Sequence, residues 1–156
     1  MPICNPSDLK RLLKPGERLI GLDVGTKTVG MALSDTTLLV ATPYDTIRRT
    51  RFQADAARLV AEIARHKVGG IVVGLPVSLD GSEGPRAQSV RQFARNLLER
   101  LDLPLAFWDE RMSTAAVERE MIAADLSRKR RAEIIDKVAA AYILQGLLDR
   151  IGRDQG

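Results

Sequence analysis

The sequence is poor in the features that define several classes of protein. Cys4 is the only cysteine among 156 residues, so no disulfide can form within the chain. No apolar run approaches the roughly 18 residues that a membrane-crossing helix needs. The N-terminal sixteen residues also lack the apolar stretch and small-residue cleavage site of a secretory signal. These absences exclude a disulfide scaffold and a membrane protein, and we expect a cytoplasmic protein in a reducing compartment.

The composition is that of an ordinary globular domain. Hydrophobic residues make up 45% of the chain and charged residues 28%, which disfavours both disorder and a fibrous class. A chain of this length buries about two-thirds of the surface that its unfolded form exposes. The formal net charge of +4 favours a polyanionic partner but is too small to establish one.

Hydrophobic periodicity predicts a mixed α/β fold. Three short runs rich in Val, Ile, Leu and Thr predict three antiparallel strands within 18–47. Alternating helices and buried strands follow: a helix over 53–67, a strand over 69–76, a helix over 85–101, a strand over 104–110, a helix from Ser113 or Thr114 to about Ala124, and a helix over about 132–151. We therefore predict a sheet of about five strands with helices on both faces.

The domain organisation that follows is simple. Residues 1–17 are polar and interrupted by proline, which predicts an N-terminal appendage with a short amphipathic stretch from Ser7 to Leu13. Residues 18–152 form the single domain, and residues 153–156 are a C-terminal tail.

Acidic residues occupy positions from which they can converge. Asp23 closes the first predicted strand, and Asp109 and Glu110 close the last one. If these strands are neighbours, their ends meet at one edge of the sheet. Asp136 lies on the final helix in series with Ala140, Ile143, Leu147 and Ile151, and this series predicts the face that packs inward.

Buried carboxylates need a compensating charge, and a divalent cation supplies it. Oxygen ligands without Cys or His favour Mg²⁺ or Mn²⁺ over Zn²⁺. Such a site can activate water and stabilise a leaving oxygen in phosphodiester hydrolysis. Each acid also has a structural explanation: Asp23 as a turn former, Asp109 or Glu110 as exposed charges at a strand end, and Asp136 as a partner of Lys137 or Arg131.

Four motifs resemble one protein family in the same order along the chain. GLDVGTKTVGMALSD, VVGLPVSLDGSEGPRAQSV, WDERMSTAAVE and IIDKVAAAYILQG are similar to blocks of the YqgF, or RuvX-like, family. The resemblance spans about 18–146. It implies a ribonuclease H-like nuclease that matures the 5′ end of precursor 16S ribosomal RNA, and it assigns the catalytic, metal-binding positions to Asp23, Glu110 and Asp136.

Several cations and one hydroxyl group could hold nucleic acid. Lys27 and Arg111 each follow a proposed metal ligand closely enough to reach a bound phosphate. Arg86 lies in the first turn of a helix after a loop whose free amides suit phosphate. Cations near a helix start oppose its dipole, so a phosphate partner explains the basic run before Asp136. The predicted nucleic-acid-binding set is Thr26, Lys27, Arg86, Arg111, Arg128, Lys129, Arg130 and Arg131.

Other polar and aromatic residues are assigned structural roles. The run Arg48, Arg49 and Arg51 is interpreted as ordinary surface. His66, beside a helix end, is predicted to be structural, and Trp108 is predicted to pack on its neighbours more readily than to stack on a base.

Alternative functions remain open at the level of the sequence. DVGTKT also resembles the first phosphate-binding loop of sugar kinases and actin-like ATPases, but those enzymes need two related domains and this chain is too short for a pair. A resolvase acting on branched DNA is a second alternative, and a non-catalytic RNA-binding ribosome assembly factor, bound to pre-ribosomal particles, is a third. The sequence leaves monomer and homodimer undecided.

Overall fold

A five-stranded mixed sheet forms the centre of the molecule. The computed structural model describes residues 3–112 and 128–153. The strand order is β3-β2-β1-β4-β5, with β1 antiparallel to β2 and parallel to β4. The strands are β1 (Arg18–Val24), β2 (Thr28–Ser34), β3 (Ala41–Arg48), β4 (Val68–Leu75) and β5 (Leu105–Asp109). The predicted mixed sheet is therefore confirmed, and β1 is its central strand.

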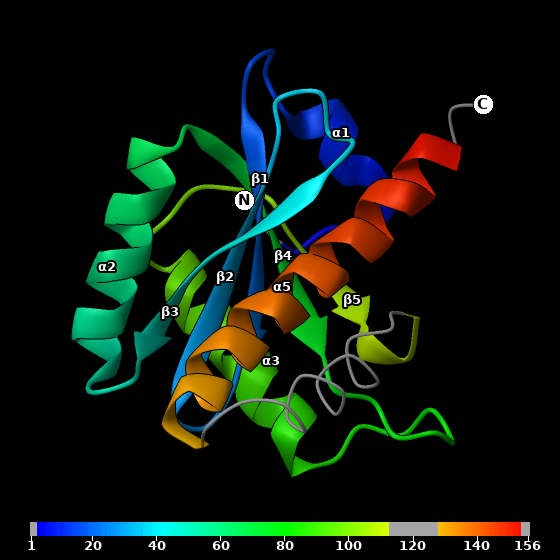
Figure 1. Cartoon of the computed structure of the whole chain (residues 1–156). Helices are drawn as coiled ribbons and strands as arrows, with labels where there is room; N and C mark the ends of the chain where they lie inside the picture. Colours follow the sequence, from blue (N-terminus) through cyan, green and yellow to red (C-terminus); the bar gives the residue numbers. More distant parts are fainter. Residues whose placement is uncertain (1–2, 113–127, 154–156) are drawn as a thin grey trace.

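Helices cover both faces of this sheet, as the sequence predicted. Helices α2 (Phe52–Arg65) and α3 (Pro85–Leu98) lie on one face, and α5 (Arg128–Arg153) crosses the other (Figure 1). Side chains alternate along β1, so Ile20 and Leu22 pack with α2 and α3 while Leu19 packs with α5. The helix predicted from Ser113 or Thr114 lies outside the described residues. No helix in the described ranges is long and apolar enough to cross a membrane.

The N-terminal segment adds to the core. It contains a 3₁₀ helix, η1 (Pro6–Asp8), and a short helix, α1 (Leu9–Leu12). Leu9 is fully buried in the cluster under α5, and the backbone N–H of Cys4 donates to the carbonyl of Leu105 at 2.9 Å. The boundary predicted after residue 17 stays a prediction, but the segment before it is packed onto the sheet.

Helix α5 approaches the sheet closely because both surfaces carry small residues. A Cβ placed on Gly21 of β1 would lie 2.8 Å from Cβ of Leu144, and Ala140 opposite it is fully buried. The alanines of α5 allow this approach, and the glycines of β1 and β2 complete it. The close approach brings the α5 backbone over the end of β1, where the acids lie.

Candidate active site

Asp23 lies near the end of β1 on the face that α5 covers. Side chains along a strand alternate between faces, so Asp23 shares its face with Leu19 and Gly21, both of which meet α5 or its cluster. Only 6% of its surface is exposed. The carboxylate therefore lies at the central strand, between the sheet and the helix.

Asp136 lies beside Asp23 because α5 crosses β2 at a glycine. Gly30 is the cross-strand partner of Asp23, and a Cβ on Gly30 would overlap the backbone carbonyl of Asp136. The Thr28 hydroxyl donates a hydrogen bond to Oδ2 of Asp136. This bond orients the carboxylate and leaves Oδ1 available as an acceptor for another group.

Glu110 reaches the same face from the other side of Asp23. It is the first residue of η2 (Glu110–Met112), just after β5, where the sequence predicted the strand to continue through it. Oε1 of Glu110 lies 3.1 Å from the position that a Cβ on Gly74 would take. The register that pairs Leu22 with Val73 brings Asp23 alongside Gly74, at the usual interstrand spacing of about 4.8 Å.

The three acids thus gather around a patch of sheet that lacks side chains. Gly30 and Gly74 flank Asp23 on its two neighbouring strands, and Asp136 and Glu110 lie over these glycines. Among the described residues, no three acidic, His or Cys side chains form a ready-made metal-binding group. The donor set consists of carboxylate oxygens, the ligand type that a hard divalent cation takes.

Asp109 faces away from this patch. It shares its side of β5 with Leu105 and Phe107, which pack in the cluster under α2 and α3. The Arg111 guanidinium donates to both Asp109 carboxylate oxygens, at distances from 2.6 to 3.1 Å. Hydrogen bonding to Arg111 lowers the pKa of Asp109. Glu110, and not Asp109, is therefore the acid that β5 brings to the α5 face.

The predicted nucleic-acid-binding residues occupy different surroundings. Thr26 and Lys27 are exposed on the turn between β1 and β2. Arg111 is held by Asp109, and its Nη1 also donates to the carbonyl of Leu79 at 3.3 Å. The basic run was predicted to precede the last helix, but α5 begins at Arg128, so the run forms its first turn. The side chains of Arg128, Lys129, Arg130 and Arg131 lie outside the described residues.

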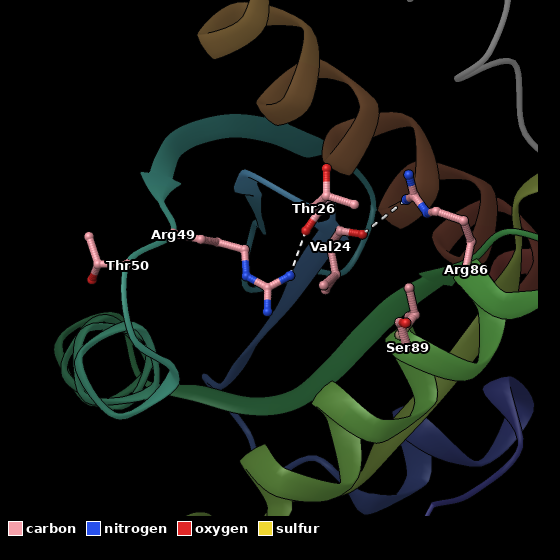
Figure 2. Close-up of a pocket in the computed structure, with 8 residues that line it drawn as sticks. Val24, Thr26, Arg49, Thr50, Arg86 and Ser89 are labelled. Carbon is pink, nitrogen blue, oxygen red and sulfur yellow. Dashed lines mark hydrogen bonds between the residues drawn. The ribbon is translucent and has the colours of Figure 1, made fainter.

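Arg86 lies close to a second arginine that the sequence did not single out. Nη2 of Arg86 donates to the carbonyl of Val24 at 3.3 Å, and Nη1 of Arg49 donates to that of Gly25 at 2.6 Å. Figure 2 shows the two guanidinium groups approaching the end of β1 from opposite sides. Arg49 was interpreted as ordinary surface. Its place follows from the pairing of β3 with β2, which brings its backbone N–H to the Lys27 carbonyl at 2.8 Å.

The two ring side chains have the structural roles that the sequence predicted. Trp108 is buried against Gly146 of α5, with 5% of its surface exposed, so it is not available to stack on a base. The His66 ring makes an edge contact with Tyr44 at 4.8 Å between centroids, after the end of α2.

Comparison with known families identifies the family of this chain. A family model described as "RuvX: Holliday junction resolvase" matches residues 17–150. The chain belongs to the RuvX family.

Close relatives of this RuvX protein cover nearly the whole chain. One from Paramagnetospirillum magneticum is 60% identical over 149 residues, which is 96% of each chain. One from Roseobacter denitrificans is 58% identical and covers 93% of this chain and 90% of its own. Both carry the name "Putative pre-16S rRNA nuclease". The predicted family membership is confirmed.

Solved structures agree with the fold of this RuvX protein. Thermus thermophilus RuvC in complex with a Holliday junction substrate aligns with a TM-score of 0.56 at 13% identity, covering 87% of this chain and 96% of that one. The yeast mitochondrial Holliday junction resolvase Ydc2 aligns with a TM-score of 0.51 at 11% identity, over 94% and 85% of the two chains. At this level of identity the likeness establishes the architecture, which is that of the predicted ribonuclease H-like class.

Proposed function

We propose that this protein is a metal-dependent nuclease that hydrolyses a phosphodiester bond near the 5′ end of precursor 16S ribosomal RNA. The observation that carries the proposal is the gathering of Asp23, Glu110 and Asp136 around the glycine-lined end of β1. The names of relatives about 60% identical supply the substrate. The family model and the fold are compatible with this activity.

The three acids carry different parts of the proposed chemistry. Asp23 is held by the central strand and is nearly buried, so it is the fixed ligand of the site. Asp136 is oriented by the Thr28 hydroxyl, which leaves one oxygen to face a cation. Glu110 is partly exposed at the start of η2, with Oε1 beside Gly74, and supplies the ligand from the β5 side. When bound, Mg²⁺ or Mn²⁺ supplies charge for the leaving oxygen and lowers the pKa of a water molecule.

The acids also need a cation for electrostatic reasons. Carboxylates within a few ångströms of one another repel, and the repulsion grows as burial lowers the effective dielectric constant. A binding module would gain nothing from such repulsion next to a phosphate. The arrangement therefore favours a catalyst over a non-catalytic assembly factor.

Cleavage of two labelled substrates tests the proposal. Precursor 16S RNA and a four-way DNA junction are incubated with wild type and Asp23→Asn, in Mg²⁺, in Mn²⁺ and in chelator. We expect the wild type to cut the RNA only with metal, and Asp23→Asn to lose activity by roughly a hundredfold or more. Cutting of the junction alone would assign the resolvase activity instead. Absence of cleavage of both substrates would contradict the nuclease assignment.

A further inference from the structure

A cavity lies on the side of β1 opposite the acids, at the same end of the strand. Its volume is about 360 Å³, and its lining includes Val24, Arg49, Thr50, Arg86 and Ser89. Val24 packs in the cluster under α2 and α3, whereas Asp23 faces α5. The cavity and the acids are therefore adjacent along β1 but open on different faces of the sheet.

The residues that line the cavity carry positive charge and no compensating negative charge. Its lining includes two arginines and no acidic residue. Within the described ranges, neither Arg49 nor Arg86 forms an ion pair, unlike Arg58, Arg91 and Arg111. Two unpaired guanidinium groups at one cavity repel each other, and an anion between them removes this cost.

Each of the two guanidinium groups is oriented by a hydrogen bond and has further N–H groups that can donate to a ligand. Arg49 and Arg86 each spend one N–H on a backbone carbonyl at the end of β1, and a guanidinium group carries five donors. Arg49 also lies over the ring of Phe93, 5.2 Å from its centroid. This anchoring reduces the entropy lost when an anion binds.

The chemistry of the lining selects a phosphate. A planar guanidinium fork matches two phosphate oxygens, and Thr26, Thr50 and Ser89 also line the cavity. Figure 2 shows Arg86 and Ser89 projecting from α3 and Arg49 entering from the opposite side, so that the cavity lies between them. Arg86 is in the first turn of α3, whose positive end adds to the attraction.

We propose that the Arg49–Arg86 cavity binds a second backbone phosphate of the nucleic-acid substrate, on the other side of the β1–β2 turn from the phosphate that is cleaved. The inference rests on the proposed function for its substrate. A strand that passes over the Gly25–Lys27 turn meets the acids on one face and the arginine pair on the other. The cavity thus fixes the position of the scissile bond by holding a phosphate away from it.

Binding without cleavage tests this inference separately from the nuclease activity. Affinity for the precursor RNA is measured in chelator over a series of salt concentrations, for wild type, Arg49→Gln, Arg86→Gln and the double variant. We expect each single variant to bind roughly tenfold more weakly at low salt. The slope of log affinity against log salt should become shallower by about one for each arginine removed.

Matched variants separate the cavity from general effects. Arg95→Gln removes an exposed charge farther along α3, where Arg95 donates to Gln92, and it should bind like wild type. Arg49→Lys and Arg86→Lys keep the charge and serve if the Gln variants unfold. They should keep the wild-type salt slope and lose affinity, because Lys lacks the fork.

Substrates with one neutral methylphosphonate locate the contact. One backbone position should weaken binding to wild type and have no further effect on the double variant. Equal salt slopes for wild type and the double variant, or fully additive losses at every position, would overturn the inference. These experiments measure binding alone, so their outcome does not depend on activity. A protein that cuts neither substrate in the cleavage assay, but whose double variant shows these binding losses, would refute the nuclease assignment and support phosphate binding at the cavity.

Discussion

The three acids are held in place by different neighbours. Asp23 is fixed by the alternation of β1 and Asp136 by the hydroxyl of Thr28, and Glu110 lies beside Gly74 and the Ile143 side chain that packs on it. Groups that hydrogen-bond to a metal ligand tune its orientation as much as the ligand's own backbone does. Replacing Thr28 therefore tests the orientation of Asp136 without changing Asp136 itself.

Replacing Thr28 by valine should weaken metal affinity and cleavage by about 10- to 100-fold, because Asp136 loses the donor that orients it. The net cost in unfolding free energy should be only about 0.5–1.5 kcal/mol. Thr28→Ser keeps the hydroxyl and should restore most of the activity. Measuring the metal concentration for half-maximal cleavage separates the two variants, and a Ser variant as impaired as the Val variant would contradict this role.

Asp35 provides a test of acid stability far from the site. Hydrogen bonds from the Thr37 side chain and the backbone amides of Val40 and Leu39 lower its pKa from 3.8 to about 2. Because the folded pKa lies below the unfolded one, its contribution is complete above about pH 4 and disappears as the pH falls toward 2.

The Asp35→Asn variant should therefore lose less unfolding free energy than wild type when the pH is lowered from 4 to 2. Urea unfolding at a series of pH values measures the difference. Parallel curves for the two proteins over this window would show that these hydrogen bonds do not stabilise the ionised carboxylate.

At the residue scale, the sequence predicted the positions of the acids along their strands and helix better than the direction in which each side chain faces. Asp23 and Asp136 were identified from a strand end and an inward helical stripe. Glu110 and Asp109 were adjacent candidates, and only the packing of Phe107 under α3 fixes the face to which Asp109 belongs. Arg49 was missed because its position depends on the β2–β3 register, which a run of three arginines does not reveal.

The contact between α5 and the sheet is the element-scale feature on which the site depends. Gly21 and Gly30 leave no room for a side chain beneath the α5 backbone. A longer side chain at either position would lift the helix that carries Asp136. The packing of glycine against alanine thus places Asp136, a proposed metal ligand, as well as stabilising the fold.

Replacing Gly30 by alanine should destabilise the protein by about 1–3 kcal/mol or more, because the new Cβ would meet the backbone of Asp136. Gly152→Ala is the matched control on α5, since nothing lies within 4 Å of its added Cβ, and it should be neutral or stabilising by up to about 1 kcal/mol. Trp108, the only tryptophan, packs against α5 at Gly146 and reports the unfolding by fluorescence. Equal urea midpoints for the two variants would contradict the close contact.

The order of elements was accessible from the sequence because hydrophobic periodicity is local. All five strands, α2 and α3 match the predicted ranges within a few residues. The strand predicted to end at Glu110 ends one residue earlier, and α5 begins about four residues before its predicted start. Glu110 begins a 3₁₀ turn, and the polar segment from Arg128 is helical although its composition has no apolar period. Both errors lie where hydrophobic spacing gives no signal.

On the scale of the whole molecule, negative charges lie on one face of the sheet at the end of β1, and positive charges lie on the other face. Acids gather under α5, and the Arg49–Arg86 cavity opens toward α2 and α3. The net charge of +4 is modest, so the positions of these cations matter more for nucleic-acid binding than their total number. The sequence predicted a phosphate partner but could not show that two arginines from distant segments share one cavity.

A Mn²⁺ titration followed by electron paramagnetic resonance tests the central claim most directly. The variants are Asp23→Asn, Glu110→Gln and Asp136→Asn, with Asp109→Asn as the control because Asp109 faces the other side of the sheet. We predict wild-type affinity for the control and affinity at least about tenfold weaker for the other three. Wild-type affinity in those three variants, or an equal loss in Asp109→Asn, would contradict a metal site at the α5 face of β1.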